Sequence, residues 1–164
     1  MKKLLIILLF CAAIVSAQDK VTALPFAELL KVIPSDINGF SLTGKPDGMN
    51  MTMGEMSYSS ATKEFVKGEQ VLKITVNDFI GYVSMYQASF GMAEGFSFED
   101  ADTKTYLETV DGVKSLISID KKDKNTNIIS GYKDRYLVII EMSGTTNEDE
   151  VKAIFKKINL NSLP

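Results

Sequence analysis

The pattern of hydrophobic and polar positions predicts a short helix followed by strands. Residues 24–33 (LPFAELLKVI) contain good helix formers with a proline near each end, which is typical of a short amphipathic helix. Residues 34–54 are rich in Pro, Gly, Asp and Asn, and are predicted to form turns. Apolar and polar residues alternate in residues 71–79 (VLKITVNDF), and Lys67–Glu69 supplies a tight turn, so residues 57–79 are predicted to form a β-hairpin.

The second half of the chain predicts a helix, four strands and a final helix. Residues 81–95 carry aromatic residues and methionine at helical spacing, which predicts about three helical turns. Short charged turns separate four later apolar segments, so we expect antiparallel strands at 103–110, 112–120, 125–132 and 135–144. Residues 145–158 begin with capping residues and acids, continue with lysines, and place apolar residues along one helical face.

This order of elements predicts an α+β fold, with an antiparallel sheet covered by N-terminal, middle and C-terminal helices. Residues 18–164 are expected to form a single domain. The hairpin SYSSATKEFVKGEQVLKITVNDF, the mid-chain helix, and GYKDRYLVIIEMSG leading into a terminal helix resemble PsbP-like domains and small secreted proteins of unassigned function. The resemblance implies an accessory or binding role, and it transfers no site residue to this chain.

The N-terminal residues 1–17 have the features of a signal peptide. Two lysines precede an uncharged apolar run too short to span a bilayer, and small residues precede an expected cleavage after Ala17. The mature protein is therefore expected to be secreted or periplasmic, with no later transmembrane segment. A lipoprotein modified at Cys11 is the alternative, but the bulky Phe10 stands where that processing requires a small residue.

Composition excludes several chemistries. Cleavage after Ala17 would leave 16 basic and 21 acidic side chains, a net charge of −5, which disfavours nucleic acid and anionic lipid as partners. The chain has no histidine and its one cysteine lies in the leader, so Ser-His-Asp triads, Cys-His dyads and ordinary zinc sites are excluded. We expect no cofactor and no enzymatic activity.

The segment GMNMTMGEM, residues 48–56, is the most unusual in the chain. If it is extended, Met49, Met51 and Met53 project from one face, and thioethers are soft ligands that select copper(I). A flexible apolar flap or an edge strand is the competing interpretation. We favour it because no histidine or cysteine supplements the sulfurs, and glycines flank the row.

Two further groups are candidates for ligand binding. Tyr82, Met85, Tyr86 and Phe90 lie at helical spacing and would line an apolar pocket between helix and sheet, or simply form core. Arg135, the only arginine, would hold a carboxylate or phosphate through a bidentate contact. A salt bridge to an acid, near Asp134 or at Glu141, is the alternative for Arg135.

The acidic segment with Glu99, Asp100 and Asp102 lacks the spacing of an EF-hand, and a solvated turn or helix cap explains it equally well. The sequence thus favours a secreted, non-enzymatic binding or accessory domain for a protein partner or a small apolar ligand. A methionine-rich copper-binding protein of the cell envelope is one alternative. A carboxylate-based hydrolase that uses Glu99 and Asp102 is the other.

Overall fold

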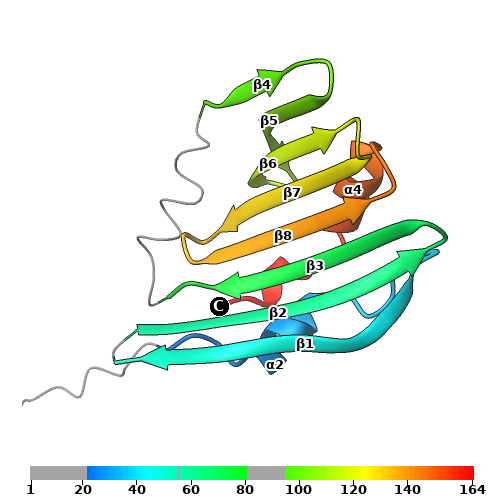
Figure 1. Cartoon of the computed structure of the whole chain (residues 1–164). Coiled ribbons are helices and arrows are strands. Elements are labelled where there is room, and N and C mark those ends of the chain that lie inside the picture. Colours follow the sequence, from blue (N-terminus) through cyan, green and yellow to red (C-terminus); the bar gives the residue numbers. More distant parts are fainter. Residues whose placement is uncertain (1–21, 55, 81–94) are drawn as a thin grey trace, which may run out of the picture.

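The computed structural model describes residues 22–54, 56–80 and 95–164, which form one eight-stranded antiparallel sheet in the order β1-β2-β3-β8-β7-β6-β5-β4 (Figure 1). Two α-helices and one 3-10 turn accompany the strands in these ranges. The bounds are α2 (Phe26–Val32), β1 (Ser41–Met53), β2 (Met56–Lys67), β3 (Gln70–Asp78), β4 (Ser97–Glu99), β5 (Thr103–Val110), β6 (Val113–Asp120), β7 (Asn125–Tyr132), β8 (Tyr136–Ser143), α4 (Glu148–Phe155) and η2 (Leu160–Ser162).

The sheet consists of two meanders that join at its centre. Strands β1 to β3 are consecutive neighbours, and β4 to β8 are consecutive neighbours that run back from the far edge. The last strand β8 pairs with β3 from Asp78↔Tyr136 to Val71↔Ser143. Consequently β1 and β4 are the two edge strands.

The core lies on one face of this sheet. Leu72, Ile74 and Ile140 alternate with outward residues on the central strands and are fully buried. Helix α2 contributes Leu29 and helix α4 contributes Val151 to the same cluster, and Figure 1 shows both helices behind the sheet. No helix in the described ranges covers the other side, which we call the open face.

The prediction of a sheet covered by N-terminal, middle and C-terminal helices is wrong. The described residues are mostly strand, with two short α-helices on one face. The composition of residues 34–54 predicts turns, yet β1, within this range, is a strand of 13 residues. Hydrogen bonding to β2 overrides the turn composition, and Pro46 falls where the register shifts between Thr43 and Asp47, a position at which a strand tolerates proline. The expected middle helix lies outside the described residues.

Other expectations are confirmed. The segment 24–33 contains α2, the hairpin 57–79 is β2 with β3, and the four later strands are β5 to β8. The terminal helix α4 begins where its capping residues indicate, because the side chain of Asn147 accepts a hydrogen bond from the backbone N–H of Glu150 at 3.3 Å. Local patterns therefore identified these elements correctly.

Candidate functional site

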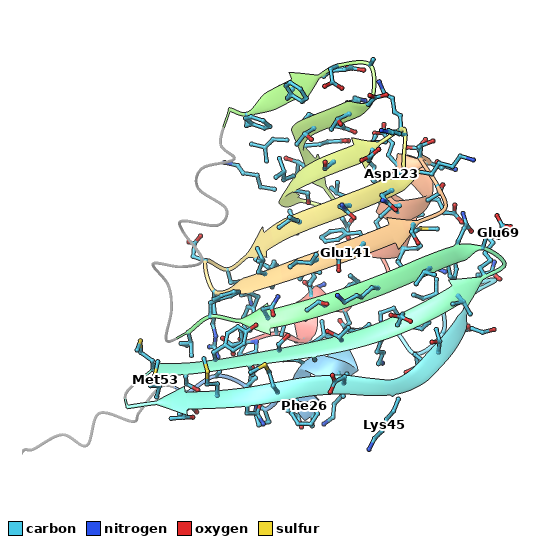
Figure 2. The ribbon with its side chains drawn as sticks, viewed as in Figure 1. Phe26, Lys45, Met53, Glu69, Asp123 and Glu141 are labelled. Carbon is cyan, nitrogen blue, oxygen red and sulfur yellow. The ribbon has the colours of Figure 1, made fainter. Side chains whose placement is uncertain are left out.

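Four exposed methionines lie together on the open face. The β1–β2 register places Met49 opposite Ser60, Met51 opposite Tyr58, and Met53 opposite Met56. Directly opposed residues share a face of the sheet, so we define Met49, Met51, Met53 and Met56 as the methionine face. Their exposed fractions are 50%, 38%, 57% and 38%. Figure 2 labels Met53, at the end of this row.

Helix α2 determines which side the methionines occupy. The side chain Oδ1 of Asn50 accepts a hydrogen bond from the backbone N–H of Phe26 at 2.8 Å. A Cβ atom at Gly48 would clash with the ring of Phe26 and would lie 2.7 Å from the backbone oxygen of Ser60, so only glycine fits beneath that ring. Gly48 and Asn50 therefore face the helix, and the alternation of strand side chains directs the methionines to the open face.

A smaller apolar cluster adjoins the methionine face. Phe79 and Leu137 are buried there, with Tyr58, Ile129 and Ile139 packed against them. The rings of Tyr58 and Phe79 meet edge to face with centroids 5.2 Å apart. Because Tyr58 lies directly opposite Met51 and is partly buried, it connects the exposed methionine face to this buried cluster.

The other end of the open face is polar. Lys73 and Glu141 form an ion pair at 3.1 Å, and both side chains are nearly half exposed. They border a shallow hollow of about 320 Å³, together with Glu64, Asn125 and Asn127. Figure 2 labels Glu141, which marks this polar end. An ion pair this exposed contributes little to stability.

Arg135 forms a buried ion pair with Asp78. The carboxylate of Asp78 is fully buried and accepts from Arg135 Nε at 2.8 Å and Nη2 at 2.7 Å. It also accepts the backbone N–H of Leu24 and of Ile80, at 2.8 and 3.1 Å. The hydrogen bonds that Arg135 donates to Asp78 raise the pKa of Arg135 and outweigh burial, which lowers it. This geometry supports the salt-bridge interpretation of Arg135, with Asp78 as partner in place of Asp134 or Glu141.

Lys63 is a second buried cation, on the covered face of β2. Its Nζ donates to the carbonyl oxygens of Ile33 at 2.6 Å and Pro34 at 3.4 Å. Ile33 follows the last residue of α2, so the lysine caps the C-terminal end of the helix. Burial lowers the pKa of Lys63.

Helix α4 is attached to β5 by a charged network around Tyr106. The Tyr106 hydroxyl donates to Glu148 Oε2 at 2.6 Å, and Lys152 Nζ lies 2.6 Å from Glu108 Oε2. Burial and the hydrogen bond to Glu148 raise the pKa of Tyr106 to about 12. Burial opposes ionisation of Glu148, but its contacts with Tyr106 and Lys152 outweigh this and lower its pKa. The groups satisfy one another, which favours a structural role.

The acidic segment forms a turn. Asp100 Oδ1 accepts the backbone N–H groups of Asp102 at 2.9 Å and Thr103 at 2.7 Å, and Glu99 pairs with Lys121 at 3.3 Å. These contacts support the turn interpretation. Across the described ranges, no three His, Cys, Asp or Glu side chains are grouped so that they could hold a metal ion.

The structure brings together only some of the residues that the sequence singled out. Met49, Met51 and Met53 share a face, whereas Arg135 is in a buried ion pair elsewhere. Tyr82, Met85, Tyr86 and Phe90 lie outside the described residues. Sequence reasoning missed Met56, although Gly54, which has a φ of +63°, signals the turn that pairs Met56 with Met53.

Comparisons with known proteins give no functional assignment. No protein-family model matches the chain, and no curated protein matches it. A solved structure of an uncharacterized protein from Mycobacterium smegmatis, the Rv0999 ortholog, is similar at 8% identity, over 85% of this chain and 99% of that one, with a TM-score of 0.41. The resemblance to PsbP-like domains stays a prediction. No helix among the described residues has the length and apolar character needed to span a membrane.

Proposed function

We propose that this chain is a secreted, non-enzymatic binding domain, and that a partner protein docks on the methionine face. The observation that carries the proposal is the exposure of four methionines on one side of a single hairpin. Contiguous apolar surface of this kind is typical of interaction sites in soluble proteins. Methionine suits such a surface because its flexible side chain adapts to the shape of a partner.

Two features favour a protein over a small apolar ligand. Small-molecule sites are usually concave, whereas the methionine face is the outer surface of two strands. In addition, β1 is an edge strand, so its outer backbone groups face away from the sheet beside the methionines. A partner that adds a strand along β1 would pair these groups and cover the sulfurs at once.

Site-specific photo-crosslinking tests this proposal in the cells that produce the protein. A benzophenone amino acid replaces Met49 on the methionine face, and in a control chain it replaces Asp123, in the exposed β6–β7 turn labelled in Figure 2. We expect Met49 to yield one discrete cross-linked protein, and Asp123 to yield none of it. Excess wild-type protein should compete for this product.

A competitor with M51S, M53S and M56S supplies the specificity control. These positions are exposed, so the substitutions should leave the fold intact, which urea denaturation checks. The polar variant should fail to compete with the cross-link. Equal competition by the two proteins, or the same product from Asp123, would refute docking on the methionine face.

A further inference from the structure

Three of the four methionines meet at the turn of the β1–β2 hairpin. Met53 and Met56 are directly opposed, and Met51 is the next residue on the same face of β1. Opposed residues on one face have Cβ atoms about 5 Å apart, and residues two positions apart along a strand are about 6.6 Å apart. Methionine has three rotatable side-chain bonds, so the three sulfurs can reach one point above the face.

The fold itself does not require methionine at these positions. Strands favour β-branched and aromatic residues, and methionine is more often buried than exposed. Met142, in the core of the same sheet, follows that rule with 1% of its surface exposed. Leucine or isoleucine would provide the hairpin with comparable apolar surface. Only a thioether provides, in addition, a soft and uncharged ligand for a metal ion.

We propose that Met51, Met53 and Met56 bind a soft monovalent cation, copper(I) or silver(I), above the open face at the hairpin turn. Thioether sulfur prefers such cations to magnesium, calcium or manganese, which prefer oxygen ligands. The exposed fractions of the three side chains, 38%, 57% and 38%, leave the ion open to exchange with the solvent. Metal binding and protein docking share these side chains but can be tested separately, because metal binding requires sulfur whereas leucine would supply comparable apolar surface for docking.

Methyl NMR tests the site residue by residue. The protein is labelled at the methionine methyl carbons and titrated with silver nitrate in a chloride-free buffer. We expect the methyl signals of Met51, Met53 and Met56 to shift and to saturate with a single ion per chain, while the signal of Met142 stays in place. Copper(I) held by a competing chelator should give the same pattern. Calcium and zinc serve as specificity controls and should leave the three signals unchanged.

Leucine variants separate sulfur chemistry from apolar area. The triple variant M51L, M53L and M56L keeps the apolar surface and should bind silver(I) at least about tenfold more weakly. The matched control M49L removes the thioether farthest from the turn and should bind as the wild type does. Equal binding by wild type and triple variant, equal loss in M49L, or no saturable shift would overturn the proposal.

The same triple variant keeps the two proposals distinguishable. Leucine maintains the apolar area, so cross-linking through position 49 should persist in it while silver binding is lost. If the serine variant fails to compete for the cross-link and the wild type binds no silver, the docking proposal stands and the metal site is rejected. Silver binding by the wild type, without any specific cross-link, would support the metal site and reject docking.

Discussion

The ion pair between Asp78 and Arg135 gives the sharpest prediction about stability. The substitution R135M removes the guanidinium but keeps an apolar stem that can pack where the arginine stem lies. It leaves the Asp78 carboxylate, which is fully buried, with the backbone N–H groups of Leu24 and Ile80 as its remaining donors. An unpaired buried charge is strongly unfavourable, so we expect R135M to be destabilised.

The expected loss of stability depends on how deeply each partner of the ion pair is buried. Removal of one partner of a buried ion pair typically costs about 3–5 kcal/mol. The side chain of Arg135 is 20% exposed, so solvent screens part of the interaction and the lower end, about 3 kcal/mol, applies. D78N should lower the free energy of unfolding by less, about 1–3 kcal/mol, because the unpaired Arg135 side chain can reach water. For R135M, the melting temperature should fall by roughly 10 °C.

Urea denaturation of the wild type, both single variants and the double variant measures these values. The two positions share one interaction, so the double variant should be less destabilised than the sum of the singles by about 1 kcal/mol or more. Unchanged m-values would show that the unfolded states are comparable. A cost of R135M below about 1 kcal/mol, or strict additivity, would refute the reasoning.

Three other predictions concern single contacts. G48V should destabilise the protein by about 1–3 kcal/mol in urea denaturation, because a Cβ there would clash with the ring of Phe26 and the backbone oxygen of Ser60. A midpoint equal to that of the wild type would contradict this packing. Burial lowers the pKa of Lys63, so the unfolded chain binds the proton of this amino group more tightly than the folded protein does. The free energy of unfolding should therefore rise as pH increases toward the ordinary lysine pKa of about 10.4. Denaturation at several pH values should show this rise in the wild type and not in K63M. The pKa of Tyr106 is raised to about 12, above the ordinary tyrosine value of about 10 in the unfolded chain. The protonated Tyr106 hydroxyl should therefore contribute fully to stability below about pH 10, and this contribution should be lost as pH rises toward 12. Absorbance titration at ~295 nm should lose a late-titrating phenol in Y106F, and an unchanged curve would contradict the hydrogen bond to Glu148.

Part of the candidate site could be predicted from the sequence. The alternation of Met49, Met51 and Met53 indicated a shared face, and the structure places them on one. The sequence could not decide which face, because this depends on Phe26 of α2 packing over Gly48. The sequence also did not reveal the ion pair between Asp78 and Arg135. The two residues are 57 positions apart and come together only when β3 pairs with β8.

The sequence alone determined the elements whose signals are local. The alternation in β3, the turn before it and the Asn147 cap of α4 all depend on residues close together in the chain. The tertiary structure decided which strands became neighbours and that residues 41–53 extend into an edge strand. Hydrogen bonds to β2 and contacts with α2 stabilise that strand, and neither interaction leaves a periodic signal in β1 itself. Strand pairing between distant segments is therefore what created the open face and gathered four methionines on it.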